Sequence, residues 1–263
     1  MLKSTHNPFA VSFGWLSLRA KRPPPGGFFT SGDRIESHGL TSTATTSTIS
    51  RLRGSPFKWL DVVALFRDAI LAVQDPSANV VAVKFFTAPI KASYARHGAD
   101  SESAQKRYHR ALLLRHPDLI EVIQGFHILG TSFLPRHVPG QPPNKVELHP
   151  VWMIEEKQTD VNLALHIYRD ALRSQCEQLV VCSNDSDLEP ALQMVRSDAP
   201  GIVIGLVTPL RETAKQEGVY SNKRLTALAD WVRHHIRDEE LAAAQLPTHV
   251  PSRKKPVSKP SHW

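Results

Sequence analysis

Cysteine is scarce in this chain, with two residues among 263. Cys176 and Cys182 lack CxxC spacing, so neither a disulfide framework nor a zinc site is indicated, and we interpret them as reduced residues in or near the core. The thirteen histidines form no HExxH pattern. The pair His234 and His235 falls on a predicted charged C-terminal helix and is expected at the surface.

Long apolar runs are also absent, so no stretch of the sequence is long enough to span a membrane. The apolar segment from Phe9 to Leu18 is interrupted by serine and glycine and leads into a basic run without an A-x-A cleavage site. It is therefore a poor signal peptide. We predict a cytoplasmic location and no membrane partner.

The net charge of +7 is unevenly distributed. Residues 1–50 hold five basic and two acidic residues, or +3, and residues 251–263 add +4, so the body over 51–250 is formally neutral. A nucleic-acid surface would thus be a local patch, although a solvated helix face explains most such charges. The candidate basic residues are Lys84, Lys91, Arg96, Lys106, Arg107 and Arg110.

Helix and strand patterns alternate over residues 51–240, which predicts an α/β domain with a parallel sheet covered by helices. The expected helices cover 59–73, 101–115, 159–174, 186–198 and 222–240, and the expected strands cover 79–86, 119–129, 178–183 and 201–207. Residues 130–150 are predicted to form a long loop, either a substrate lid or an insert. Residues 241–263 are predicted to form a flexible tail rich in Pro and Lys.

Two carboxylates follow the buried strand that ends at Cys182. The segment Ser183-Asn184-Asp185-Ser186-Asp187 places Asp185 and Asp187 at the carboxyl end of a strand, where ligands collect in open α/β sheets. Carboxylate oxygens suit Mg²⁺ or Mn²⁺. Helix capping explains one of the two aspartates equally well. Ser183 and Asn184 are candidates for positioning a substrate or a water, with turn formation as the alternative.

A third carboxylate, Asp160, stands in the first turn of the predicted helix over 159–174. The helix dipole alone would stabilise a carboxylate there. One αβ unit separates it from Asp185 and Asp187, so the three could converge at one sheet edge, where a metal ion would relieve their repulsion.

The segments 157–165 (KQTDVNLAL) and 182–192 (CSNDSDLEPAL) together resemble the NYN domain, a branch of the PIN-like nuclease superfamily. The resemblance covers about Leu52 to Glu240. It implies a PIN-like Rossmannoid three-layer sandwich and a metal-dependent ribonuclease, with Asp160, Asp185 and Asp187 as catalytic residues and ligands of Mg²⁺ or Mn²⁺, and RNA as a partner.

One acidic residue of that family, at the end of its first strand, has no counterpart here. Residues 41–49 read TSTATTSTI, and codons shifted by one nucleotide permit the family's Tyr-Val-Asp-Gly-Tyr-Asn-Leu-Tyr-Tyr, with Thr43 in the place of the aspartate. We therefore expect residues 1–50 to be an out-of-frame, disordered segment that forms no strand over 38–46. An ordinary Ser/Thr-rich linker is the alternative.

The resulting functional hypothesis is a ribonuclease impaired by the loss of one carboxylate. A non-catalytic RNA-binding or protein-interaction module on the same fold is the alternative, since fold does not dictate function. An Asp-x-Asp phosphatase of the haloacid dehalogenase type is disfavoured, because the chain continues with Leu188-Glu189 where that motif would normally have Thr.

Overall fold

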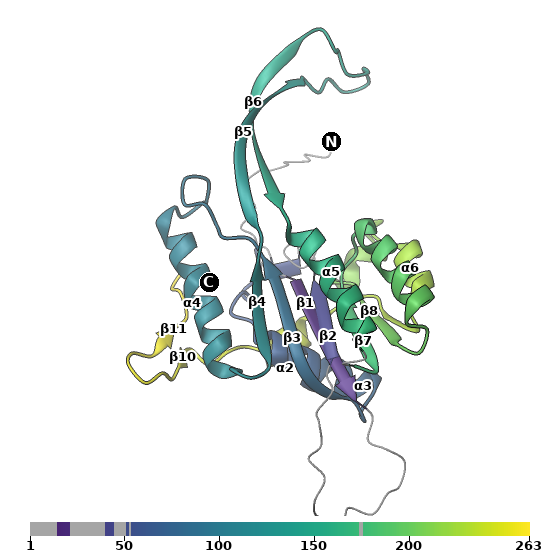
Figure 1. Cartoon of the computed structure of the whole chain (residues 1–263). Helices are drawn as coiled ribbons and strands as arrows, with labels where there is room; N and C mark the ends of the chain where they lie inside the picture. The colour runs from purple at the N-terminus through teal and green to yellow at the C-terminus, as the bar shows by residue number, and fades with distance from the viewer. Residues whose placement is uncertain (1–14, 22–39, 45–50, 53, 174–175) are drawn as a thin grey trace, which may run out of the picture.

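A mixed seven-stranded sheet forms the centre of the chain (Figure 1). The computed structural model describes residues 15–21, 40–44, 51–52, 54–173 and 176–263. The strand order is β4-β3-β1-β2-β7-β8-β9. These strands are β1 (Trp15–Lys21), β2 (Leu40–Ala44), β3 (Asn79–Thr87), β4 (Ile120–Gln124), β7 (Gln178–Cys182), β8 (Val203–Val207) and β9 (Trp231–Arg233).

Most neighbouring strands of this sheet run parallel, but β1 runs antiparallel to β2, β3 and β7. The pairs β3–β4, β2–β7, β7–β8 and β8–β9 are parallel. The predicted α/β class is therefore confirmed in its coarse form. The sheet is mixed, so the predicted parallel three-layer Rossmannoid of the PIN type is not confirmed.

Strand β2 contradicts the expectation that residues 38–46 form no strand. It pairs in parallel with β7 and places Thr43 opposite Val181. Thr is β-branched and suits a strand, and the central position gives its backbone groups partners on the neighbouring strands. Apart from β1 and β2, residues 1–50 lie outside the described part of the chain, so the predicted disorder of those other residues stays a prediction.

The helical elements occupy the connections between the strands. They are α2 (Val62–Ala64), η1 (Leu65–Leu71), α3 (Ala72–Gln74), α4 (Ala99–Arg115), α5 (Thr159–Leu172), η2 (Ser186–Leu188), α6 (Glu189–Asp198), η3 (Glu212–Lys215), α7 (Lys223–Leu228) and α8 (Asp238–Ala243). Segment η1 has π-helical hydrogen bonding and joins α2 to α3, so the helix predicted over 59–73 is one interrupted element. The helices predicted over 101–115 and 159–174 match α4 and α5 closely.

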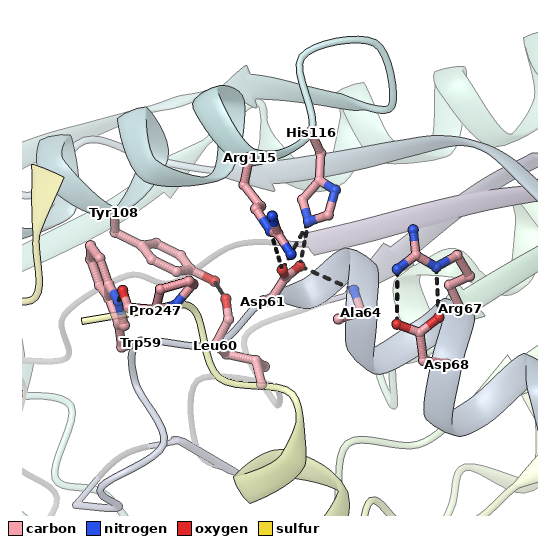
Figure 2. A network of polar contacts seen from close by, with 10 residues as sticks. All are labelled: Trp59, Leu60, Asp61, Ala64, Arg67, Asp68, Tyr108, Arg115, His116 and Pro247. Carbon is pink, nitrogen blue, oxygen red and sulfur yellow. Dashed lines mark hydrogen bonds and ion pairs between the residues drawn. The ribbon is translucent and has the colours of Figure 1, made fainter. Parts of the chain in front are cut away.

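A buried carboxylate fixes the start of the α2 segment (Figure 2). The Asp61 Oδ1 atom accepts the Ala64 backbone N–H at 3.0 Å, which caps the helix. The His116 Nε2 atom lies 2.8 Å from both Asp61 carboxylate oxygens, and Arg115 Nε lies 4.0 Å away. A single aspartate therefore ties the beginning of α2 to the end of α4.

The C-terminal segment packs against the core, contrary to the predicted flexible tail. Strands β10 (His249–Val250) and β11 (Val257–Ser258) form a small hairpin with Val250 and Val257 buried. Trp59 Nε1 donates to the Pro247 carbonyl at 2.8 Å (Figure 2), and the Trp263 ring lies edge-on to Trp59 with centroids 6.1 Å apart. The Pro/Lys-rich composition concealed these few apolar anchors.

The helix predicted over 222–240 is wrong, because the segment is divided into α7, β9 and α8. Asp230 interrupts it: its carboxylate accepts the Ile204 N–H at 2.6 Å, and its own N–H donates to the Ile204 carbonyl at 2.7 Å. The following residues then pair in parallel with β8. A tertiary pairing outweighs the local helical pattern here.

The predicted loop over 130–150 is a loop over 136–147, and its two ends belong to the strands of a β-hairpin. Strands β5 (Phe126–Pro135) and β6 (Leu148–Lys157) pair antiparallel from Phe126 opposite Lys157 to Pro135 opposite Leu148. This hairpin, called the arm below, projects from the body of the chain (Figure 1). At its base a Cβ on Gly125 would come within 2.3 Å of the Lys157 carbonyl oxygen, so glycine permits this close approach of the two strands.

Candidate functional site

The loops that follow β7 and β8 form the candidate site at the carboxyl end of the sheet. Strand β7 is buried along its whole length and ends at Cys182, and the segment 183–187 follows at once. Crevices at this end of parallel strands are where open α/β sheets bind ligands. The segment 183–187 thus lies at the end of the sheet where the sequence predicted the site.

Ser183 and Asn184 hold the loops of the site together. Ser183 is buried, and its hydroxyl oxygen accepts the Asp185 backbone N–H at 2.9 Å. Asn184 Nδ2 donates to the Tyr220 carbonyl at 3.1 Å, and Asn184 Oδ1 accepts the Asn222 N–H at 2.6 Å. Turn formation, the alternative interpretation, therefore describes their contacts. Their role in positioning a substrate or water stays a prediction.

Asp185 and Asp187 lie at the start of η2. The Asp185 carboxylate accepts the Asp187 N–H at 3.1 Å and so caps this short helix. Asp187 itself is exposed. Capping is thus realised for one of the two aspartates, and the other presents its charge to solvent at the rim of the site.

Asp160, in the first turn of α5, lies within electrostatic range of both. The pKa of its carboxyl group is raised to about 6, first by partial burial and then by the negative charges of Asp185, Glu156 and Asp187, in that order. The residue as a whole remains exposed, so the burial concerns only its carboxyl end. The predicted gathering of the three aspartates, with one raised carboxyl pKa, agrees with this shift.

Convergence stops short of a metal site. Within the residues that the structure describes, no group of three or more His, Cys, Asp or Glu side chains could hold a metal ion. The expectation of Mg²⁺ or Mn²⁺ bound by Asp160, Asp185 and Asp187 is therefore not met by the geometry. We call Glu156 and these three aspartates the acidic cluster.

A pocket of about 420 Å³ lies among the loops after β8 and β9, and the backbone carbonyl of Tyr220 in its lining accepts the hydrogen bond from Asn184. Its lining combines apolar, aromatic, histidine and cationic side chains. The His234 Nδ1 and Ser221 Oγ atoms are 2.9 Å apart within it. The lining residues are Leu210, Arg211, Glu212, Ala214, Lys215, Val219, Tyr220, Ser221, His234 and His235.

Sequence patterns alone did not reveal this pocket. Its residues come from the loop after β8, from η3, from the loop before α7 and from the loop after β9, and the predicted helix over 222–240 concealed the last of these loops. His234 and His235 were expected on that helix. The one available signal was the clustering of Arg211, Lys215 and Tyr220 after a buried strand, which carries no motif.

The predicted basic patch is wrong in one central member. Lys84 is buried, and its Nζ atom lies 2.6 Å from the Asp170 Oδ2 atom, so it forms an ion pair between β3 and α5. Nearby, burial and then the charges of Lys84 and Arg169 lower the pKa of His166 to about 4. Lys84 and Asp170 therefore belong to the interior of the sheet–helix contact rather than to a nucleic-acid surface.

Comparison with known proteins identifies a relative. The chain is 39% identical over 226 residues to 6-hydroxy-3-succinoylpyridine 3-monooxygenase HspA of Pseudomonas putida, covering 81% of this chain and 70% of the relative. No family model matches the chain, and no solved structure matches it significantly.

This relationship corrects five expectations. The resemblance to the NYN domain is wrong as a family assignment, because the relative is named as a monooxygenase and no NYN model matches. Ribonuclease activity is wrong for the same reason, the alternative of an RNA-binding module is without support, and the Mg²⁺ or Mn²⁺ cofactor falls with the nuclease mechanism. The out-of-frame interpretation of residues 41–49, which rested on the NYN pattern, loses its basis.

In the described part of the chain, no helix combines the length and apolar character needed to cross a membrane.

Proposed function

We propose, because the chain belongs to the family of the Pseudomonas putida 6-hydroxy-3-succinoylpyridine 3-monooxygenase, that it is a monooxygenase acting on an anionic, nitrogen-containing aromatic compound. The observation that carries this proposal is the 39% identity over 81% of the chain. A monooxygenase inserts one atom of O₂ into its substrate and reduces the other to water with two electrons from a donor.

The pocket chemistry supports an anionic aromatic ligand. Arg211 and Lys215 supply positive charge, and Tyr220 supplies an aromatic face beside the apolar Leu210 and Val219. A volume of about 420 Å³ suits a single small molecule. A guanidinium binds a carboxylate in a fixed two-donor geometry, so Arg211 would hold the acid group of such a ligand.

A flavin is the cofactor class that fits this reaction, and the same pocket fits it in kind. In place of the substrate, Arg211 and Lys215 would hold the phosphate of a flavin mononucleotide, with Tyr220 against its ring system, so the pocket holds one of the two ligands. The sequence contains no G-x-G-x-x-G segment, so the common dinucleotide fingerprint is not available. When bound, a flavin supplies oxygen activation and accepts electrons from the donor.

The acidic cluster gives the site a proton acceptor. With its pKa raised to about 6, Asp160 can exchange protons near neutral pH, as a general base requires. We assign it the task of accepting a proton that the reaction releases. Asp185 and Asp187 would support this role, because their negative charges raise the pKa of Asp160. These roles replace the metal-ligand roles expected of the same residues.

Binding measurements test the pocket assignment and distinguish its two possible ligands. Titration calorimetry with 6-hydroxy-3-succinoylpyridine, and separately with flavin mononucleotide, would compare the wild type with Arg211→Gln and Lys215→Gln. Lys91→Gln, which removes an exposed cation outside the pocket, is the matched control. Weakening of one ligand by both pocket variants, at least about tenfold, identifies that ligand as the occupant. Equal binding by all four proteins would refute the pocket assignment.

Oxygen uptake tests the activity itself. The purified chain with 6-hydroxy-3-succinoylpyridine, flavin and a reduced nicotinamide should consume O₂ only when all components are present.

The cytoplasmic location and the RNA partner inferred from the sequence both stay untested predictions. We retain the cytoplasmic location as a proposal, because two free cysteines are typical of a reducing compartment.

A further inference from the structure

A second, smaller cavity adjoins the pocket described above. Its volume is about 270 Å³, and we call it the Arg51 cavity. Arg51, Pro209 and Glu217 line this cavity but not the pocket, whereas its other lining residues are common to both. The cavity is therefore a neighbouring space with lining residues of its own. Its lining consists of Arg51, Pro209, Leu210, Arg211, Ala214, Glu217 and Val219.

Arg51 brings a buried guanidinium to this cavity. The residue is only 3% exposed. Its Nε and Nη2 atoms donate to the Ile236 carbonyl at 3.2 and 3.0 Å, and Nη2 also pairs with the Asp238 carboxylate. A guanidinium has five N–H donors, two of which belong to Nη1. Within the described part of the chain, Nη1 makes no hydrogen bond, so these two donors are free.

The free end of the guanidinium is open to the cavity. Several buried side-chain atoms among the described residues lack a hydrogen-bond partner and are sealed from solvent, and Nη1 is not one of them. Because Arg51 is otherwise enclosed, the open space that Nη1 reaches is the cavity that this residue lines. A buried cation with free donors is stabilised by an anion that accepts hydrogen bonds from them.

The rest of the lining indicates which kind of anion fits. Arg51 and Arg211 carry two positive charges, and Glu217 carries the one negative charge of the lining. The side chain of Asp238, which also contacts Arg51, is 66% exposed, so water screens its charge. The other four lining side chains are apolar. One net positive charge among apolar walls matches a monoanion with a short apolar body better than a dianion such as phosphate.

We propose that the Arg51 cavity binds the carboxylate of a short aliphatic acid. Arg51 Nη1 donates to the carboxylate, Arg211 adds positive charge, and the apolar side chains contact the aliphatic chain. The volume is below the range of roughly 300–1,000 Å³ that holds drug-sized ligands, so the acid has only a few carbon atoms. This assignment goes beyond the proposed monooxygenase function and does not depend on it.

Titration with butyrate, followed by two-dimensional ¹H–¹⁵N NMR, tests the proposal. The backbone amide of Glu217 reports on the Arg51 cavity, and that of Ser221 reports on the pocket. At pH 7, butyrate should shift the Glu217 amide to saturation with a Kd of about 1–10 mM, the range expected for one small charged group. Inorganic phosphate at the same ionic strength should bind more weakly.

Two variants alter the cavity in opposite directions, and each has a matched control. Arg51→Gln should raise the Kd for butyrate at least about tenfold, because it removes the buried charged donor. Glu217→Gln should lower the Kd about threefold, because it removes the opposing carboxylate. Lys215→Gln and Glu212→Gln make the same changes of charge at residues that line only the pocket. Each control should change the Kd less than about 1.5-fold, since solvent screens charges outside the cavity.

The proposal is overturned if the Glu217 amide shows no saturable shift, or if phosphate binds more tightly than butyrate. Equal Kd values in the wild type, Arg51→Gln and Glu217→Gln would also overturn it. Circular dichroism establishes that each variant is folded. If Arg51→Gln is not, the comparison of Glu217→Gln with Glu212→Gln decides alone. The monooxygenase proposal is measured separately by O₂ uptake, so either proposal can fail while the other holds.

Discussion

Replacement of Asp160 by Asn should make the stability of the chain less dependent on pH. Burial and three neighbouring carboxylates raise the pKa of Asp160 from 3.8 to about 6 in the folded protein. The protonated form is therefore favoured by folding. Its stabilising contribution is fully present below pH 3.8 and is lost as the pH rises through about 6. The Asp160→Asn variant has no such contribution to lose, because an amide does not titrate in this range.

The magnitude follows from the shift. Two pKa units correspond to about 3 kcal/mol for a group that is shielded from water. Asp160 is more than a third exposed, so solvent screening reduces the expected effect to about 1 kcal/mol. Between pH 4 and pH 7.5, the free energy of unfolding of Asp160→Asn should rise by about 1 kcal/mol relative to that of the wild type.

Urea unfolding at a series of pH values measures this difference directly. Asp187→Asn is the companion variant, because it removes one of the charges that raise the pKa of Asp160 and should shift the pH at which stability is lost downward. The reasoning is refuted if the difference between Asp160→Asn and the wild type is flat across this range, or if it falls with rising pH.

Three further substitutions test other parts of the structure, each by denaturant unfolding. Gly125→Ala should destabilise the chain by about 1–3 kcal/mol, because the new Cβ would meet the Lys157 carbonyl at 2.3 Å, and a neutral result would mean that the arm base is looser than described. Lys84→Met should cost about 3 kcal/mol, since it leaves the buried Asp170 carboxylate without its nearest cation, and no loss would deny that ion pair a structural role. Asn222→Ala should cost about 1 kcal/mol by removing the cap of α7, and an unchanged unfolding midpoint would contradict that capping.

Local patterns sufficed where burial and periodicity agreed. Helix α5 and strand β7 match their predicted ranges closely because their apolar residues recur at the helical spacing or fill a short buried run. The gathering of Asp160, Asp185 and Asp187 at one end of the sheet followed from the order of these two elements. The metal-dependent ribonuclease chemistry inferred from that gathering was wrong. A short motif with two aspartates after a strand is found both in helix caps and in nuclease sites, so the motif alone does not distinguish them.

Features set by distant contacts could not be predicted. The division of the segment 222–240 depends on hydrogen bonds between Asp230 and Ile204, and the packing of the C-terminus depends on Trp59 and Trp263. The arm had the composition of a loop, since Pro and Gly cluster at its tip and hide the alternation of its strands. The pocket joins three loops that carry no common motif, so only the folded chain brings its side chains together.

Isotope labelling of the product tests the central claim most directly. The purified chain would be supplied with 6-hydroxy-3-succinoylpyridine, flavin mononucleotide, a reduced nicotinamide and ¹⁸O₂, and the ring product would be examined by mass spectrometry. A monooxygenase predicts one ¹⁸O atom per product molecule, with none when the label is supplied in water. A product whose new oxygen comes from water, or a folded chain that binds the compound but neither consumes O₂ nor alters it, would contradict the account.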